Sequence, residues 1–421
     1  MTDTTHRSRP RGPRFRSPLR GPWLTSVFGA VLLIALPVVT VTGLLSWVAY
    51  GPRFGQSMPG DVAWLHLPYF DWPTRPSWIY RLNQGLHVGL GLVLVPIVLA
   101  KLWSVIPKFF EFPPVRSPAQ ALERVSLLAL VGGVLFEIVT GVLNIQYDYI
   151  FGFSFYTAHY WGAWVFIGGF VAHVVVKVPV MVRTLRGRSF MDVMRQRVAD
   201  TEPEQRDDTG LVATDPAPAT VSRRGALALV GGGALFVAVL TAGQTTGGFL
   251  RNAAILLPRG RSYGDGPNDF QVNRTSAAAG VTADQVGDGW RLTLLGGDAP
   301  LEMTRAQLQA MPQTTVRLPI ACVEGWSTVQ TWTGVRLRDL QAAVGVDSID
   351  NAEVQSLERA GSFNRVTFPA NQFSDGDSLL ALQVNGVDLS LDHGFPARIM
   401  IPGIPGVHQT KWVRSIEFRQ V

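Results

Sequence analysis

The chain has 421 residues, enough for two or three domains, and its formal net charge is +6 at pH 7. A basic balance is compatible with nucleic-acid binding. Here, however, the arginines cluster beside apolar segments, so membrane orientation explains them better and no nucleic-acid partner is predicted. Cys322 is the single cysteine, which excludes an intramolecular disulfide.

Five apolar stretches are long enough to cross a bilayer, which needs about 20 mostly apolar residues. Aromatic residues gather near their ends, as expected at a membrane–water interface, and membrane helices tolerate prolines such as Pro96. The sequence therefore predicts a membrane α-helical bundle of five transmembrane helices with the lipid bilayer as a partner. The predicted spans are Trp23–Tyr50, Trp78–Ile106, Val125–Tyr147, Tyr156–Val182 and Gly225–Phe249.

Arginine and lysine set the predicted orientation, because they are enriched on the cytoplasmic side of a membrane. The N-terminus and the segment Arg183–Arg224 should therefore face the cytoplasm, and five crossings should leave everything after Phe249 outside a plasma membrane. Thr201–Thr220, rich in Pro, Asp and Glu, is predicted to be a flexible cytoplasmic linker. The basic residues used are Arg7, Arg9, Arg11, Arg14, Arg16, Arg20, Lys108, Arg116, Arg183, Arg186, Arg188, Arg195 and Arg197.

These boundaries divide the chain into five parts. They are a basic cytoplasmic tail (1–22), a four-helix membrane domain (23–186), a cytoplasmic linker (187–221), a fifth transmembrane helix (222–250) and an extracytoplasmic domain (251–421). The fifth helix begins Ser222-Arg223-Arg224-Gly225, which resembles a twin-arginine export signal embedded in the chain. Taken alone, the pair is explained equally well as two more cytoplasmic arginines.

Three histidines and a glutamate fall inside the predicted spans, where ionisable groups are costly and usually functional. His87 lies in the second span. His159 and His173 lie in the fourth span. They share one face, because their separation turns a helix through about 1400°, close to four full turns. Imidazole is a common axial ligand of haem iron, so the pattern favours a b-type haem over hydrogen bonds to neighbouring helices. Glu137 in the third span suits a proton relay, a quinone contact or a carboxyl bonded to a neighbour.

The histidine pattern resembles the four-helix cytochrome b subunits of respiratory formate dehydrogenases and hydrogenases, which implies the quinone pool as a partner. In that family each fourth-span histidine pairs with one histidine from the first or second span. The first span here has none, so a second haem should be absent or ligated unusually. The resemblance pairs His87 with His159, whereas depth in the membrane alone would also allow His87 with His173.

After Arg251 the sequence changes to short alternating apolar runs bounded by turn signals such as Asn385-Gly386. This pattern predicts a mainly β (α+β) domain with short helices at Thr304–Ala310, capped by Thr304, and at Leu337–Val344. The predicted strands are Trp290–Leu295, Thr315–Ala321, Glu353–Leu357, Arg365–Phe368, Leu379–Val384, Ala397–Ile401 and Val413–Phe418.

Three motifs stand in this domain: Cys322–Ser327 followed by Trp332–Val335, then Asp392–Arg398, then Pro402–Trp412. In this order and spacing they resemble the molybdopterin-binding domain of the sulfite oxidase and protein-methionine-sulfoxide reductase superfamily, over roughly 264–421. The resemblance implies Mo-molybdopterin as the cofactor. Molybdenum takes a soft, deprotonated sulfur from the protein, so Cys322 is the candidate catalytic residue and metal ligand. The alternative for a lone cysteine is a packed core residue.

The resemblance also implies residues that hold the anionic cofactor. Arg398 offers a bidentate fork to a phosphate, and Lys411 offers a point charge. His393 can bond the pterin or the phosphate, and backbone groups from Gln409 to Lys411 complete the phosphate end. Gly394 and Gly406 would allow close backbone approach.

The segment from Asn268 to Arg274 matches the first cofactor-contacting stretch of the family. Sulfite oxidases have Phe-x-Arg-Asn-His there, with an arginine that helps to hold sulfite. Val272 falls at that arginine and Arg274 at the histidine, which weakens the case for sulfite as the substrate. The predicted cofactor-binding residues of this segment are Asn268, Gln271, Asn273 and Arg274.

The sequence therefore predicts a molybdenum-dependent oxidoreductase that links a quinone, a haem and a small-molecule or protein-bound oxygenated substrate. A sulfoxide-type reductase is favoured. Because the family loads molybdopterin in the cytoplasm, the domain would cross the membrane folded, which favours the export interpretation of Arg223-Arg224. The alternatives are a sulfite dehydrogenase working in the oxidative direction and, from another class, a metal-free membrane-anchored binding or scaffold protein.

Overall fold

The computed structural model describes residues 15–55, 58–62, 64–110, 117–206, 209–260 and 264–420. The chain divides into two compact units, each assembled from separate stretches. The first unit comprises Met1–Val38, Leu92–Ile138 and Gly162–Val237. The second unit comprises Val39–Gly91, Val139–Trp161 and Ala238–Val421. The basic residues Arg7, Arg9, Arg11, Arg14 and Arg116, used in the orientation prediction, lie outside the described residues.

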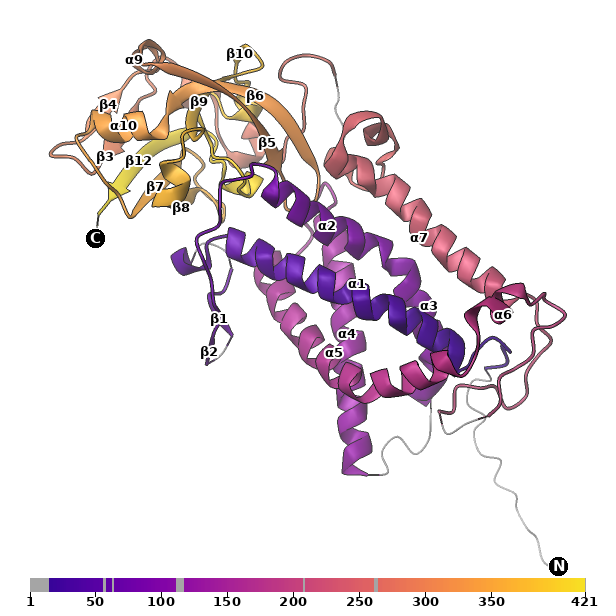
Figure 1. The fold of residues 1–421 in the computed structure, drawn as a ribbon. Helices are drawn as coiled ribbons and strands as arrows, with labels where there is room; N and C mark the ends of the chain where they lie inside the picture. The colour runs from indigo at the N-terminus through magenta and orange to yellow at the C-terminus, as the bar shows by residue number, and fades with distance from the viewer. Residues whose placement is uncertain are drawn as a thin grey trace, which may run out of the picture. The chain divides into compact units, whose positions relative to one another are not determined.

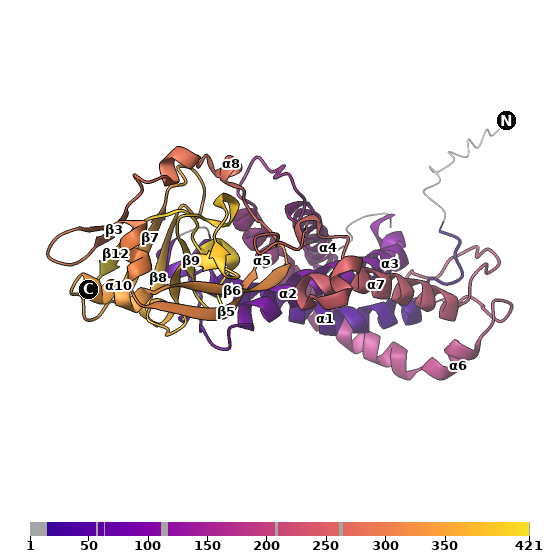
Figure 2. The same cartoon turned by 90° about the horizontal axis from the view of Figure 1, so that it is seen from above.

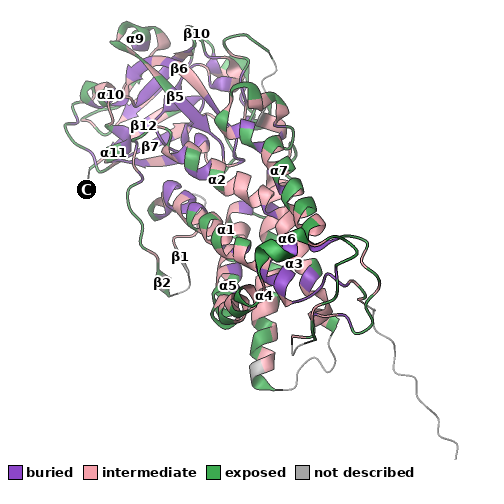
Figure 3. Ribbon diagram, turned by 45° about the vertical axis from the view of Figure 1, so that its right-hand side comes forward, coloured by how far each residue is buried: buried purple, intermediate pink, exposed green. Residues whose placement is uncertain are grey.

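Within the described residues, five helical segments are long and apolar enough to cross a membrane, as predicted. Their apolar stretches are mostly unburied, and the helices are largely pink and green in Figure 3. The second predicted span is broken at Leu94, because Pro96 lacks the N–H that would continue the helix. The helices of this part are α1 (Pro22–Ala49), α2 (Ile79–Val93), α3 (Val95–Val105), α4 (Pro118–Asn144), α5 (Phe155–Arg186), α6 (Phe190–Arg195) and α7 (Arg223–Thr246), with a small pair of strands β1 (Asp61–Val62) and β2 (Leu65–His66).

In the first unit, glycines let α4 and α5 pack closely. A Cβ at Gly133 would lie 2.8 Å from Phe166 Cα, and one at Gly169 would lie 2.5 Å from Leu130 N. Small residues at contacts of this kind are typical of membrane helices, because they bring two backbones together.

The C-terminal part of the second unit is β-rich, with two five-stranded sheets (Figures 1 and 2). One sheet has the order β10-β9-β6-β5 with β11 also paired to β9, and all its pairs are antiparallel. The other has the order β4-β3-β12-β7-β8, in which only β12 and β3 are parallel. The strands are β3 (Leu292–Leu295), β4 (Leu301–Met303), β5 (Gln313–Ala321), β6 (Ser327–Arg336), β7 (Asn351–Ser356), β8 (Arg365–Pro369), β9 (Leu379–Val384), β10 (Val387–Asp388), β11 (Arg398–Met400) and β12 (Val413–Arg419).

Local sequence signals explain several of these elements. Asn385 and Gly386 both have positive φ, as a two-residue hairpin turn requires, and they join β9 to β10. Thr304 caps α9 (Arg305–Ala310) in a reciprocal box with Gln307, which confirms the predicted cap. The remaining helices are α8 (Ser276–Ala279), α10 (Leu337–Ala343), which was predicted, and α11 (Ala370–Phe373).

Among the described residues, the sequence analysis missed five strands: β1, β2, β4, β6 and β10. β6 is the largest omission, because its ten residues include several Thr and Gln side chains and do not alternate cleanly. Its centre is nevertheless in the core: Trp332 is fully buried and packs with Leu318 of β5 and Val384 of β9. The buried strands appear purple in Figure 3.

Candidate functional site

A cavity of about 90 Å³ in the second unit gathers four of the predicted cofactor-binding residues: Asn273, Arg274, Gln409 and Lys411. Its remaining described lining residues come from the loop after β7 and from the Gly406–Trp412 segment. They are Ser356, Glu358, Gly361, Ser362, Phe363, Gly406, Val407, Thr410 and Trp412.

Two buried cations lie beside this cavity. Lys411 Nζ donates to the backbone oxygens of Arg274 and Asp392, the latter at 2.8 Å. Burial, and then the charge of Arg398, hold the pKa of Lys411 well below its usual value. Burial alone lowers the pKa of Arg398 to about 9. Arg398 forms no ion pair with any described residue and, with a pKa of about 9, is charged near pH 7, so an anion bound beside it would compensate its buried charge.

His393 stands at the other side of Arg398, whose Nη1 donates to the His393 carbonyl at 3.3 Å. Its ring stacks on Phe270 with centroids 3.6 Å apart, and its Nε2 lies 2.9 Å from the carbonyl oxygen of Asn268. Burial, and then Arg398, lower the pKa of His393 to about 3, so its imidazole is neutral near pH 7. Asn268 itself accepts from Ser390 N at 3.0 Å, which fixes the start of the predicted Asn268–Arg274 segment.

Buried polar atoms here retain bonding capacity. Gln409 Nε2 donates to Ile401 O at 3.1 Å, but its Oε1 has no hydrogen-bond partner among the described residues. The same holds for Arg398 Nε and His408 Nε2 within the part of the chain that is described. Such buried orphan atoms usually mark a missing ligand or water, so this donor and acceptor set fits a polar, anionic cofactor. Gln271, from the same predicted set, is also buried.

Arg274 is placed differently from the buried cations. Its Nε pairs with Glu358 at 2.8 Å, and its side chain is 43% exposed. Asn273 Oδ1 accepts from the Arg274 backbone N–H at 3.0 Å. These two residues therefore stand at the cavity wall, with Arg274 already neutralised by a carboxylate.

Cys322 does not line the cavity and is buried in the core with Trp326 and Trp332. Its loop is a tight turn in which Gly325 N donates to Cys322 O at 3.0 Å. Burial, and then Glu324, raise the pKa of the thiol well above its usual value. A Cβ at Gly406 would lie 2.8 Å from the carbonyl oxygen of Ala321, the residue before Cys322, so the backbone at Gly406 passes close to the Cys322 loop. The approach of Gly406 to the cofactor stays a prediction.

Gly394 lies beside Lys411, and its close approach to the cofactor stays a prediction. It has a φ of 109°, and a Cβ there would lie 3.1 Å from Lys411 Cβ. A side chain at Gly394 would therefore displace Lys411, which explains why the backbone needs glycine at this position.

His87 and His159 lie together in the second unit, with ring centroids 6.2 Å apart and planes at 86°. His87 Nδ1 lies 3.0 Å from Val39 O, and His159 Nδ1 lies 3.1 Å from Thr140 Oγ1. His173 belongs to the first unit and is not part of this pair.

The side chain of Glu137 also lies in the first unit, beside Gly162 of α5. A Cβ at Gly162 would lie 2.3 Å from its Oε1. This contact with a neighbouring helix is the simpler of the interpretations that the sequence left open.

Several neighbours of the site carried no assigned role in the sequence analysis. Asp392 Oδ1 accepts from both the backbone and the hydroxyl of Ser276 at 2.8 Å. Phe363 and Glu358 stand in a loop with no motif, and only their contacts reveal them.

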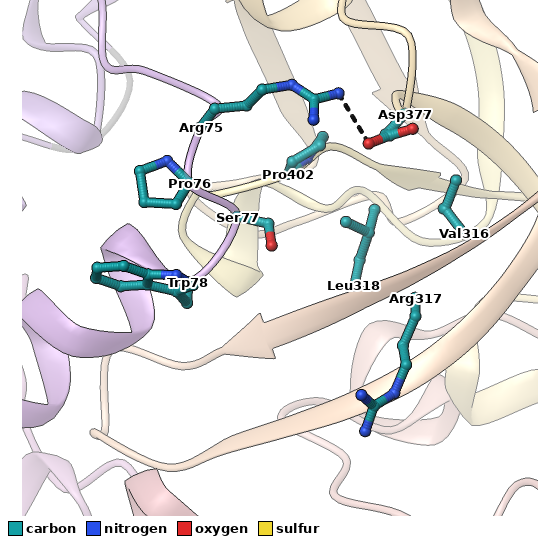
Figure 4. A pocket seen from close by; sticks show the side chains of 9 residues that line it. All are labelled: Arg75, Pro76, Ser77, Trp78, Val316, Arg317, Leu318, Asp377 and Pro402. Atoms are coloured by element: carbon teal, nitrogen blue, oxygen red, sulfur yellow. Dashed lines mark hydrogen bonds and ion pairs between the residues drawn. The ribbon is translucent and has the colours of Figure 1, made fainter.

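A separate open cleft of about 540 Å³ lies between the loop before α2 and β5. Figure 4 shows its lining, with Arg75 paired to Asp377 at 2.8 Å and Arg317 pointing away from that pair. Its described lining residues include none of the predicted cofactor-binding residues.

Comparison with known proteins agrees with the C-terminal motifs. Residues 279–421 match the family model of the oxidoreductase molybdopterin-binding domain. The uncharacterized oxidoreductase YuiH of Bacillus subtilis (strain 168) is 32% identical over 131 residues, 31% of this chain and 65% of that protein. The sulfite oxidase of Arabidopsis thaliana is 31% identical over 99 residues, 20% of this chain and 25% of that protein. Among solved structures, the sulfane dehydrogenase SoxCD of Paracoccus pantotrophus is 27% identical with a TM-score of 0.29, covering 31% and 38% of the two chains.

This chain spans less than two thirds of the length of each of these relatives. Its C-terminal region is an oxidoreductase molybdopterin-binding domain of the sulfite oxidase type, as the motifs predicted. The matches support a molybdenum-dependent oxidoreductase with Mo-molybdopterin as its cofactor.

Lowering the pH from 7 to 5 should destabilise the protein prepared without cofactor. Burial lowers the pKa of both His393 and His408 to about 3, whereas an unfolded histidine titrates near 6.5. The unfolded state therefore binds more protons below about pH 6.5, and each histidine should cost about 2 kcal/mol of stability at pH 5. Thermal unfolding should be measured at both pH values. The loss of stability between pH 7 and pH 5 should be smaller in the His393→Gln/His408→Gln double variant than in the wild type. An equal loss in both proteins would contradict the assignment.

Proposed function

We propose that this protein is a membrane-bound molybdopterin-dependent oxidoreductase. It would pass electrons between the quinone pool, a b-type haem and an oxygen-atom-transfer substrate outside the membrane. The observation that carries the proposal is the position of α2. Gln84 Nε2 donates to Val323 O at 2.6 Å, beside Cys322, and His87 follows about one turn later on the same helix. One helix thus joins the loop of the candidate molybdenum ligand to His87, one of the two candidate haem ligands.

The geometry of the histidine pair supports a haem. A haem would need two imidazoles close enough to share one iron, and His87 and His159 would supply them. The observed spacing of His87 and His159 is 6.2 Å. Metal-bound histidines usually give their other ring N–H to a carbonyl or similar acceptor, and Val39 O is placed to accept from His87 Nδ1. His87 and His159 are therefore the proposed axial ligands.

Lys411 and Gln409 of the cavity wall, together with the neighbouring Arg398 and His393, would hold the anionic end of molybdopterin. Lys411 and Arg398 supply buried positive charge, and Gln409 and His393 supply hydrogen bonds. Bound molybdenum would exchange an oxygen atom with the substrate and electrons with the haem. Cys322 would serve as a thiolate ligand, because metal binding lowers a thiol pKa that burial alone raises. The loop of Cys322 is kept in place by Gln84.

Apolar exposure supports membrane insertion. Soluble proteins rarely expose large contiguous apolar patches, yet α1, α4, α5 and α7 each expose several large apolar side chains. Under the positive-inside rule the molybdopterin domain lies outside. Because the cofactor is loaded before export in this family, Arg223-Arg224 would mark a twin-arginine route.

Substrate choice follows from the departure at Val272, where sulfite oxidases carry an arginine. This departure favours a sulfoxide-type reductase driven by quinol. The similarity to a plant sulfite oxidase makes a sulfite dehydrogenase the second candidate.

Replacing Cys322 by serine should abolish turnover and leave folding intact, because the change is nearly isosteric and removes only the sulfur. Turnover with methionine sulfoxide, dimethyl sulfoxide or sulfite should be compared in wild type and Cys322→Ser, with circular dichroism as the folding control. If the serine variant turns over at the wild-type rate, Cys322 is not the molybdenum ligand.

Reporter fusions should place Thr214 on the cytoplasmic side of the membrane and the C-terminus on the opposite side. Opposite signals are expected because one crossing, the fifth span at α7, lies between the two fusion positions. Equal signals would exclude an odd number of spans.

Arg223→Lys/Arg224→Lys should strand the domain in the cytoplasm, whereas Arg186→Lys/Arg188→Lys should not.

The purified protein should show the absorption of a low-spin b-type haem at about one iron per molybdenum. His87→Ala and His159→Ala should each remove this spectrum. His173→Ala is the matched control and should spare it, because His173 belongs to the other compact unit. Loss of the spectrum only in His173→Ala would refute the pairing, and a haem-free wild type would refute the electron-transfer proposal.

A further inference from the structure

A continuous run of aromatic rings leads from the histidine pair to the cavity. Ring centroids are 4.9 Å apart for His159 and Phe155, 5.7 Å for Phe155 and Tyr156, and 5.6 Å for Tyr156 and Phe363. Each spacing falls within the 4.5–7 Å range of aromatic rings in contact. Phe363 is itself a wall of the cavity.

The rings come from parts of the chain that are far apart. Phe155 and Tyr156 begin α5, whereas Phe363 stands in the loop between β7 and β8. Tyr50 packs against this run, with its centroid 5.5 Å from Tyr156, 5.9 Å from Phe363 and 5.1 Å from His408. Tyr50 and His408 are buried, so the junction between α5 and the loop is closed by rings on this side.

We propose that Phe155, Tyr156 and Phe363 form an aromatic bridge that carries electrons between a haem at His87 and His159 and a cofactor in the cavity. The inference rests on the proposed function, because it needs both groups. Aromatic rings in contact shorten the gaps across which an electron must pass, and saturated side chains of similar size do not offer delocalised orbitals. The bridge works in either direction of net flow.

The stoichiometry of the reductive direction is balanced. Reduction of a sulfoxide takes two electrons and two protons and yields a sulfide and water. A quinol supplies both electrons and releases two protons as it becomes a quinone. Two single-electron transfers would therefore cross the bridge for each substrate, drawn from the haem that His87 and His159 would hold and replaced by the electrons of the quinol.

A second route competes with the bridge. It runs from His87 along α2 to Gln84 and through the hydrogen bond to Val323 O, beside Cys322. This route consists of saturated side-chain and backbone bonds and one hydrogen bond. Variants of Tyr156 and Gln84 separate the two routes, because each residue belongs to only one of them.

The experiment uses detergent-purified holoprotein. Haem is reduced, the protein is mixed with methionine sulfoxide or dimethyl sulfoxide, and haem reoxidation is followed by stopped-flow absorption. If only sulfite reacts, haem reduction by sulfite is followed instead. Tyr156→Leu should slow this transfer several-fold, and Tyr156→Phe, which keeps the ring, should restore it. Phe153 is an exposed aromatic residue just before α5. Phe153→Leu is the control and should leave the rate of haem reoxidation unchanged.

Further readouts keep the inference separate from the proposed function. In Tyr156→Leu the haem spectrum, the molybdenum content and turnover driven by a viologen that reduces the molybdenum site directly should be unchanged. A wild-type rate of haem reoxidation in Tyr156→Leu would overturn the bridge. Loss of viologen-driven turnover in the same variant would also overturn it. Slow electron transfer in Gln84→Leu, combined with a normal rate in Tyr156→Leu, would also overturn the bridge. A wild type without haem would instead refute the proposed function.

Discussion

The hydrogen bond from Gln84 to Val323 is the contact on which the arrangement of the second unit depends. Gln84 is buried and its bond to Val323 O is part-buried, and a buried carboxamide left without its partner costs about 1–3 kcal/mol. Ser46 Oγ donates to the Oε1 of the same side chain at 2.8 Å, so both ends of the amide are satisfied. Any shift of the Cys322 loop relative to α2 would break this network, and His87 lies on the same helix.

Neighbouring contacts reinforce this constraint. Thr245 Oγ1 donates to Gly325 O at 2.9 Å, and Arg251 donates to Ser327 O at 2.5 Å. Arg259 pairs with Glu324 at 2.6 Å, and burial raises the pKa of that carboxyl while Arg259 opposes the shift. The backbone and the one acid of the Cys322 loop are therefore satisfied by residues outside the β sheets. The loop would be under-bonded without α2 and the end of α7.

Local signals predicted much of the fold, and long-range packing decided the rest. β9 was found at its observed bounds because its apolar run ends in Asn385-Gly386, whose φ values the turn needs. β6 was missed because burial at Trp332 comes from β5 and β9, not from its own alternation. The break at Leu94 follows from Pro96, but a sequence window that sums apolar residues passes over it.

The candidate site shows the same division. Arg398, Lys411 and Gln409 were identified from motifs, and the structure adds that their burial leaves charge and orphan atoms beside a cavity. No sequence signal marked Phe363, because its ring contacts join it to Tyr50 and Tyr156, which are far away in the chain. Residues at such junctions are visible only once the parts of the second unit are packed together.

These observations bear on why helices and the molybdopterin domain share one chain. A domain that only docked on a separate membrane protein would need its own partners for the carbonyls of Val323, Gly325 and Ser327. Here those partners are supplied by Gln84, Thr245 and Arg251, so residues of the same chain outside the β sheets complete the bonds of the loop around Cys322. Covalent linkage also removes the entropic cost of association that a separate subunit would pay at each encounter. The same packing that satisfies the loop brings α2 and α5 against it, and thus sets the spacing between the histidine pair and the cavity.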